Sequence, residues 1–103
     1  MKNTGLGVLD LTSFVFWHID VITAAQLRAA RALAGIDQRE LANLSGLSVP
    51  TIQRMEASDG VIRGNVDSLM KLIAALDAAG IVLIGDDAIS EQGGRGVRLK
   101  KRV

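Results

Sequence analysis

Few side chains in this sequence of 103 residues could perform covalent or metal chemistry. There is no cysteine, and His18 is the only histidine, so a thiolate site and a histidine-based metal site or triad both lack the residues they need. Asp86, Asp87 and Glu91 could together hold a cation, but acidic residues are also common in turns. We therefore expect no catalytic residue, no metal, no cofactor and no small-molecule ligand, and we expect that the protein is not an enzyme.

The remaining chemistry is charge and hydrogen bonding. The net charge is +1, from 12 basic and 11 acidic residues, but the charge is uneven along the chain. The charged residues of 93–103 are all basic, whereas residues 65–92 are acidic on balance. A basic run of this kind could contact phosphate groups, and it is equally typical of a solvated strand end.

The elements that must position these groups are expected to be mostly helical. Hydrophobic residues make up 49% of the sequence and aromatic residues only 3%, which favours a helical core of small and branched aliphatic side chains. No apolar run approaches the roughly 20 residues of a membrane-spanning helix. Together with the absence of cysteine, this pattern predicts one small cytoplasmic domain with no membrane partner.

The starts of four helices can be predicted from capping signals. Two capping boxes and two single N-cap residues are expected, at Thr23–Gln26, Asp37–Glu40, Ser48 and Asn65. Pro50 would be the second residue of the third helix, where its missing N–H removes no helical hydrogen bond. In the first helix, helical spacing predicts a buried face made of Leu27, Ala30, Leu33 and Ala34.

The two ends of the chain differ from this helical middle. The apolar segment 81–84 and the segment 96–100, in which apolar and basic residues alternate, flank a stretch rich in turn-forming residues, which predicts a β-hairpin. Because an isolated hairpin is marginally stable and has open edges, we interpret residues 81–103 as a possible dimerisation element. Residues 1–21 are interpreted as an N-terminal extension, either an arm or the product of a misassigned start codon.

The second and third helices meet the geometric demands of a helix-turn-helix. Ala42 supplies a small residue where the two helices cross, and Gly46 supplies a residue that tolerates positive φ in the turn. Apolar residues fall where the two helices must bury their inner faces, at Leu41, Leu47, Ile52 and Met55. Unrelated helical hairpins rarely meet all of these demands, so we predict this motif.

The segment "DQRELANLSGLSVPTIQRMEASDG", residues 37–60, resembles the helix-turn-helix of the Cro/C1-type (XRE) family of bacterial and phage DNA-binding regulators. The resemblance extends over about residues 22–80. It implies a mainly α, lambda-repressor-like bundle of four to five helices, here followed by the C-terminal hairpin. It also implies a homodimer that binds double-stranded DNA at a near-palindromic operator, with the second helix of the motif in the major groove.

The resemblance also assigns roles to individual residues. The base-facing positions of the motif are Val49, Pro50, Gln53 and Arg54, and the phosphate-contacting positions are Gln38, Ser48, Thr51 and Arg63. Arg54 could bond guanine in bidentate fashion, and Gln53 could bond adenine or a phosphate. Val49 and Pro50 depart from the polar residues that many relatives place there, and they could at most pack on a thymine methyl group.

Simpler interpretations stand beside these roles. Ser48 is also an N-cap, Thr51 and Arg63 are also ordinary surface residues, and Arg54 could lie on a solvated helix face. Arg31 and Glu56 match positions that form a partly buried ion pair in the family, and we interpret them as structural.

Three functions fit this pattern. The first is a sequence-specific DNA-binding transcriptional regulator, most simply a repressor that occupies its operator as a dimer. The second is the antitoxin of a toxin–antitoxin pair, which would neutralise a partner protein and repress its own operon. The third is a helix-turn-helix fold used only as a protein adaptor, which the near-neutral charge of residues 23–64 keeps open.

Overall fold

The computed structural model of this protein describes residues 22–85 and 92–101. Its elements are α2 (Ala24–Ala34), α3 (Gln38–Ser45), α4 (Val49–Glu56), α5 (Val66–Ala78), β1 (Ile81–Ile84) and β2 (Gly96–Leu99). The predicted fold class, mainly helical with a C-terminal hairpin, is confirmed. The interpretations of residues 1–21, with His18, and of the acidic group Asp86, Asp87 and Glu91 lie outside the described residues.

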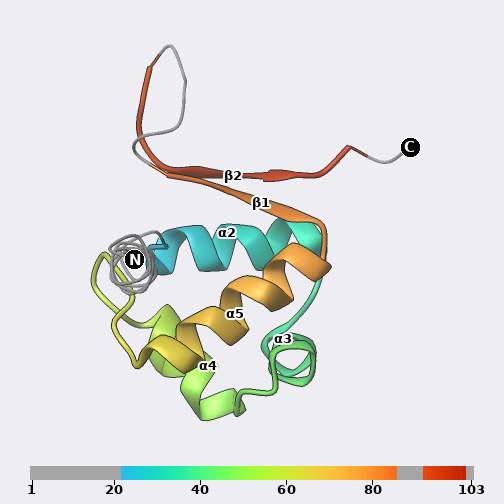
Figure 1. The fold of residues 1–103 in the computed structure, drawn as a ribbon, viewed down its shortest axis with the longest axis vertical. Coiled ribbons are helices and arrows are strands. Elements are labelled where there is room, and N and C mark those ends of the chain that lie inside the picture. The colour runs from blue at the N-terminus through green and yellow to red at the C-terminus, as the bar shows by residue number, and fades with distance from the viewer. Residues whose placement is uncertain (1–21, 86–91, 102–103) are drawn as a thin grey trace, which may run out of the picture.

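Helix α2 lies in the middle of the molecule, with the helices α3, α4 and α5 on one side and the hairpin on the other (Figure 1). It contacts α4 and both strands, while α5 contacts α3 and β1. The core fills the space between these elements, and its largest buried side chains are Ile22, Leu27, Leu41, Ile52, Met55, Ile62, Leu69, Leu72 and Leu76. Among the described residues, every helix is too short or too polar to span a membrane.

All four predicted N-caps are present. In each case the side-chain oxygen of the N-cap residue accepts a hydrogen bond from the backbone N–H three residues later, and the two capping boxes are complete. The donor–acceptor distances lie between 2.8 and 3.2 Å for the pairs Thr23–Gln26, Asp37–Glu40, Ser48–Thr51 and Asn65–Ser68. The helix starts are therefore encoded locally, by residues only three positions apart.

The prediction for Leu33 is wrong, because 45% of this residue is exposed. Leu33 lies about 120° around the helix from Leu27, at the margin of the apolar stripe. Ala34 and Ile36 pack against the core at this end of α2, so Leu33 is left on the outer side.

The loop after α4 is held against the start of α2. Two backbone hydrogen bonds, from Ala24 N to Gly60 O at 2.9 Å and from Ile62 N to Ile22 O at 3.1 Å, flank an antiparallel bridge between Thr23 and Val61. Ile22 and Ile62 are both buried. The pairing fixes where the chain enters α2 and the path of the loop that follows α4.

The hairpin packs on α2 through one face. Ile81 is buried, and Leu83 and Val97 pack against the core on the same side of the strands. Val82 and Ile84 alternate with them and point to the opposite, outer face. The basic strand β2 lies on the far side of α2 from α4, which favours its interpretation as a solvated strand end (Figure 1).

The turn between α3 and α4 gives a direct test of backbone strain. Gly46 has φ of +76°, and a Cβ added there would meet no atom within 4 Å. A Gly46→Ala substitution should therefore destabilise the protein by about 1–2 kcal/mol through the left-handed conformation alone. Urea unfolding of the variant measures this loss.

The matched control is Gly64→Ala, because Gly64 lacks a positive φ and its added Cβ would meet only Met55 Cε at 3.9 Å. We expect this control to keep or slightly raise the stability. Equal losses in both variants would contradict the strain argument.

Candidate functional site

The turn between α3 (Gln38–Ser45) and α4 (Val49–Glu56) has the geometry that a helix-turn-helix requires. Gly46 ends α3 in the left-handed conformation, and its N–H donates to Ala42 O at 2.9 Å. Ser45 Oγ then accepts from Leu47 N at 3.2 Å, which closes the turn. Ala42 is buried, and α3 contacts α4. The predicted small residue and the predicted glycine thus serve the structural purposes inferred for them.

Ser48 and Thr51 form a small hydroxyl pair at the start of α4. Ser48 Oγ caps the helix by accepting from Thr51 N, and it lies 2.9 Å from Thr51 Oγ1. One hydroxyl must donate to the other, so the pair keeps a single hydroxyl hydrogen for an outside acceptor. Pro50 follows at the start of the helix and is exposed, as the capping assignment requires.

The four positions assigned to base contact are not equally accessible. Pro50, Gln53 and Arg54 are exposed, whereas Val49 is half-buried and packs against the core. Within the described part of the chain, no hydrogen bond or ion pair holds the Gln53 and Arg54 side chains. Helix α4 therefore presents two long hydrogen-bonding side chains to solvent, and its buried side carries Ile52 and Met55.

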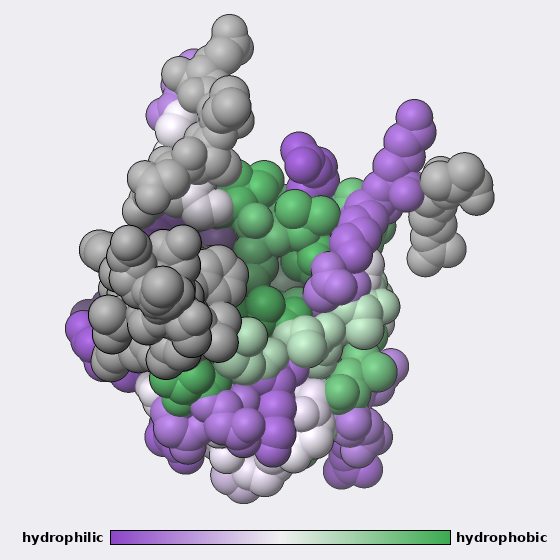
Figure 2. Space-filling model, viewed as in Figure 1, coloured by the Kyte–Doolittle hydropathy of each residue, from purple (hydrophilic) through white to green (hydrophobic). Residues whose placement is uncertain are grey.

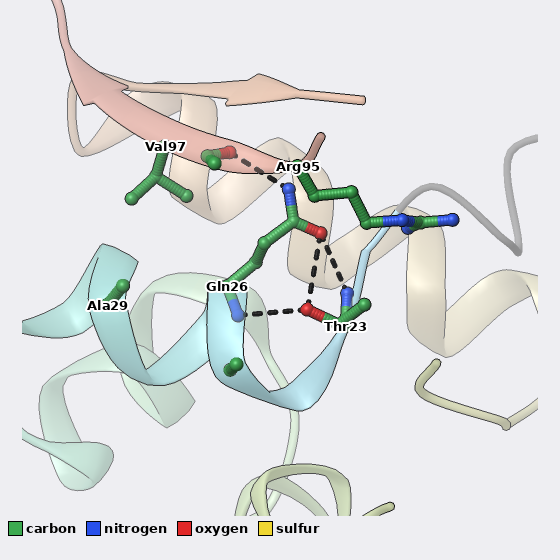
Figure 3. Close-up of a pocket in the computed structure, with 7 residues that line it drawn as sticks. Thr23, Gln26, Ala29, Arg95 and Val97 are labelled. Atoms are coloured by element: carbon green, nitrogen blue, oxygen red, sulfur yellow. Dashed lines mark hydrogen bonds between the residues drawn. The ribbon is translucent and has the colours of Figure 1, made fainter. Parts of the chain in front are cut away.

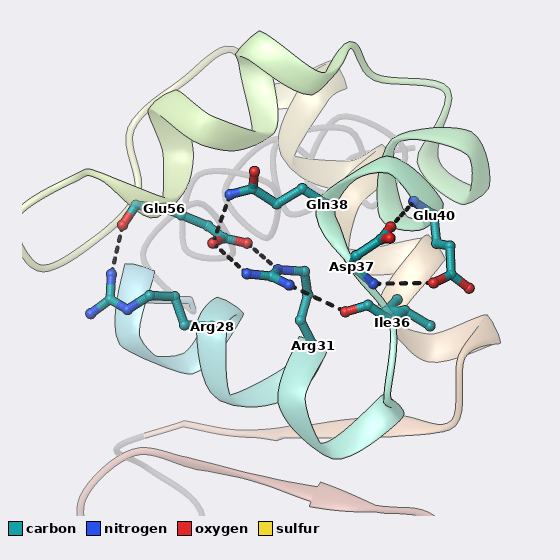
Figure 4. A network of polar contacts seen from close by, with 7 residues as sticks. All are labelled: Arg28, Arg31, Ile36, Asp37, Gln38, Glu40 and Glu56. Atoms are coloured by element: carbon teal, nitrogen blue, oxygen red, sulfur yellow. Dashed lines mark hydrogen bonds and ion pairs between the residues drawn. The ribbon is translucent and has the colours of Figure 1, made fainter.

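The carboxylate of Glu56, at the end of α4, is the centre of a polar network that joins three helices (Figure 4). Arg31 on α2 binds it with two parallel bonds, Nε to Oε2 at 2.5 Å and Nη2 to Oε1 at 2.9 Å. The remaining Arg31 Nη1 donates to Ile36 O at 3.2 Å. The Glu56 side chain is 7% exposed and the Arg31 side chain 23%, so the structure contains the partly buried ion pair.

Gln38 and Arg28 complete this network. Gln38 Nε2, at the first position of α3, donates to Glu56 Oε1 at 3.1 Å. Arg28 Nη1, one turn before Arg31 on α2, donates to Glu56 O at 2.6 Å and so satisfies a carbonyl at the C-terminal end of α4. Glu56 of α4 is thus bonded by two residues of α2 and by one residue of α3 (Figure 4).

The network shifts the pKa of both charged partners. Burial disfavours the charged form of Glu56, but the hydrogen bonds from Arg31 and Gln38 and the charges of Arg31 and Arg28 outweigh it, so the pKa of Glu56 is lowered. The hydrogen bond to Glu56 raises the pKa of Arg31 against the effect of its own burial, with further support from the charges of Glu56 and Asp37. The ion pair is therefore fully charged at neutral pH.

The sequence-based assignment did not identify Arg28. Arg28 and Arg31 are three residues apart on one helix, so they lie on the same face, and this spacing was the available signal. Gln38 was assigned to a phosphate contact, and its bond to Glu56 was also not anticipated. Arg63 is exposed in the loop after α4. It follows Val61 and Ile62, which pair with the start of α2.

Two comparisons with known proteins bear on this site. The family model described as a helix-turn-helix domain matches residues 23–81, which is more than half of the chain. A search of curated proteins finds no significant match. The matched range includes all four described helices and the first residue of β1.

Glu56→Gln tests the network through the pH dependence of stability. At pH 7 we expect this variant to lose roughly 2–4 kcal/mol, below the loss for a fully buried pair because Arg31 keeps some contact with water. The pKa of Glu56 is lower in the folded chain than in the unfolded one. The stabilisation is therefore complete above the unfolded pKa, and it is lost as the pH falls through the folded pKa.

The difference in unfolding free energy between wild type and Glu56→Gln should thus shrink below about pH 4.5. Chemical unfolding at a series of pH values measures it. Glu40→Gln, which alters an exposed capping carboxylate, is the control and should differ little from wild type throughout. A gap for Glu56→Gln that stays constant from pH 7 to pH 3 would contradict the role of the charge.

Proposed function

The chain belongs to a helix-turn-helix domain family, and we propose that it is a sequence-specific DNA-binding regulator of transcription, as in the XRE-type regulators that its sequence resembles. In this proposal α4 lies in the major groove, and α3 approaches the phosphate backbone. The observation that carries it is the exposed face of α4. Gln53 and Arg54 project from a helix whose other side is bonded to α2 and α3.

Base recognition in this proposal depends mainly on two residues. Arg54 presents a planar guanidinium that matches guanine O6 and N7, and Gln53 presents an amide that matches adenine N6 and N7. Pro50 is exposed and could pack on a thymine methyl group. Val49 contributes least, because it already packs against the core.

The phosphate contacts are proposed for groups at the edge of this face. An amide nitrogen carries two hydrogens, so the bond from Gln38 to Glu56 leaves one for a phosphate oxygen. The hydroxyl pair of Ser48 and Thr51 has one hydrogen to give. Arg63 adds an exposed positive charge in the loop after α4. These contacts would set the position of α4 on the duplex, and the base contacts would set its preference.

We propose a homodimer that forms through the outer face of the hairpin. Apolar surface gathers over α2 and the hairpin in Figure 2. Val82 and Ile84 are half-buried apolar residues on the outer face of the strands. A two-fold dimer carries two copies of α4, so the operator would be near-palindromic. Occupancy of an operator that overlaps a promoter would repress transcription.

The same apolar face supports a second candidate function. If a different protein covers Val82 and Ile84, the chain would act as an antitoxin whose DNA binding regulates its own operon. The two candidates differ in the state of the isolated chain. In isolation, the regulator would form a homodimer. The antitoxin would instead need its partner protein to cover this face.

Selection of bound duplexes from a random pool tests the DNA-binding proposal. We expect a near-palindromic site to be enriched. Arg54→Ala should then weaken binding to that site by about 1–3 kcal/mol and relax the preference at one base pair in each half-site. Gln53→Ala should relax the preference at a neighbouring base pair. Fluorescence anisotropy at fixed salt gives the affinities.

Lys71→Ala is the control for these substitutions, because it also removes one exposed positive charge, on α5 away from the proposed interface. It should keep both the affinity and the preferred site. No enrichment by a folded wild-type chain, or equal effects of Arg54→Ala and Lys71→Ala, would contradict the proposal.

Solution mass tests the dimer proposal. Val82→Lys adds a charge to the outer face of the hairpin without touching the residues that pack on α2. We expect wild type to be a dimer and this variant a monomer by sedimentation equilibrium. Met70→Lys, at an exposed apolar residue of α5, is the control and should stay dimeric. A monomeric wild-type chain would favour the partner-protein alternative.

A further inference from the structure

Gln26, on the first turn of α2, is a buried polar residue with an unusual set of partners. Its side chain is directed at the hairpin (Figure 3). Nε2 donates to Gly96 O at 2.9 Å and also to Ile84 O at 3.0 Å. Ile84 and Gly96 are paired with each other across the two strands. The two hydrogens of one amide are therefore divided between β1 and β2.

The oxygen of the same amide is bonded within α2. Gln26 Oε1 accepts from Thr23 N at 2.9 Å and lies 3.4 Å from Thr23 Oγ1, which completes the capping box. With two donors and two lone pairs in use, the amide has no capacity left. The residue is only 4% exposed, so each of these bonds is shielded from water.

Within residues 22–85 and 92–101, the other described contacts between the hairpin and the helices are mainly apolar. Ile81, Leu83 and Val97 pack by apolar contact, which is not directional. At the far end, Lys100 bonds Asp77 at 2.8 Å, but both side chains are largely exposed, so this pair contributes little. Beside Gln26, a pocket of about 370 Å³ is lined by Ala29 of α2 and Val97 of β2, so the packing between α2 and β2 is incomplete there (Figure 3).

We propose that Gln26 is a positioning residue that holds the hairpin at a fixed angle on α2 and, through it, fixes the distance between the two copies of α4 in the dimer. The second part rests on the proposed function. A fixed hairpin makes the protein select one spacing between the half-sites of its operator, because the two recognition helices cannot adjust independently. The Gln26 side chain thus bonds the start of α2 and both strands of the hairpin at the same time.

Gln26→Glu separates the two roles of this residue. A glutamate keeps the oxygen that caps Thr23 N, but it loses both donors and brings a carboxylate against two carbonyl oxygens. Glu40→Gln makes the reverse exchange in the capping box of α3, where the side chain bonds only Asp37 N. Both substitutions therefore keep a side-chain oxygen for the capping hydrogen bond. Only Gln26→Glu also removes the hydrogen bonds to the hairpin.

Two measurements on the full chain at pH 7.5 test the proposal. By NMR hydrogen exchange, hairpin amides should exchange at least about tenfold faster in Gln26→Glu, as expected for two lost hydrogen bonds, and at the wild-type rate in Glu40→Gln. In selection from duplexes whose half-sites are separated by varied lengths, Gln26→Glu should accept several spacings. Its preferred half-site sequence should remain that of wild type.

Two results would overturn the proposal. One is unchanged hairpin exchange in Gln26→Glu, and the other is an unchanged spacing preference despite faster exchange. Failure of wild type to enrich any duplex would instead overturn the proposed function, and the exchange rates would still decide on the contact between Gln26 and the hairpin. If Gln26→Glu does not fold, Gln26→Met takes its place, because it removes the hydrogen bonds without burying a charge. Glu40→Met is then the control, because it removes the corresponding capping bond of α3.

Discussion

The arrangement of this molecule depends on one buried carboxylate, that of Glu56. A carboxylate with 7% exposure is costly unless it is paired and hydrogen-bonded, and here Arg31 and Gln38 supply those partners from two other helices. Glu56 is the last residue of α4. These bonds, together with the one from Arg28 to the Glu56 carbonyl, therefore set the orientation of α4 relative to α2 and α3. The exposed face of α4, with Gln53 and Arg54, is presented in that fixed orientation.

Helix α2 connects this network to the rest of the molecule. Toward α4 it contributes Arg28 and Arg31, and toward the hairpin it contributes Gln26. Each side is held by buried or partly buried polar bonds, which are directional, while the apolar core between them supplies stabilisation without specifying angles. Helix α2 thereby lies between the hairpin, which is proposed to form the dimer, and the helices α3 and α4, which are proposed to approach DNA (Figure 1).

Much of this fold could be predicted because its signals are local. Each helix start depends on a cap and a backbone N–H three residues later, and the turn depends on the positive φ of Gly46. The contacts of Gln26 with the hairpin could not be predicted, because they join residues 58 and 70 positions apart and leave no periodic pattern. The exposure of Leu33 was missed for a related reason, since Ile36 takes the place against the core that helical spacing assigned to it. At the candidate site, residue types were sufficient to place α4, but which donors bond Glu56 follows only from the packing of three helices.

In the proposed function, the face of α4 that carries Gln53 and Arg54 contacts base pairs. The most direct measurement is an NMR titration of the isotopically labelled chain with its selected duplex, with a scrambled duplex of equal length and charge as the reference. We expect the largest differences between the two titrations on α4 and on the side chains of Gln53 and Arg54, with smaller ones at the start of α3. Differences confined to the hairpin or to α5, or identical titrations with both duplexes, would contradict this expectation.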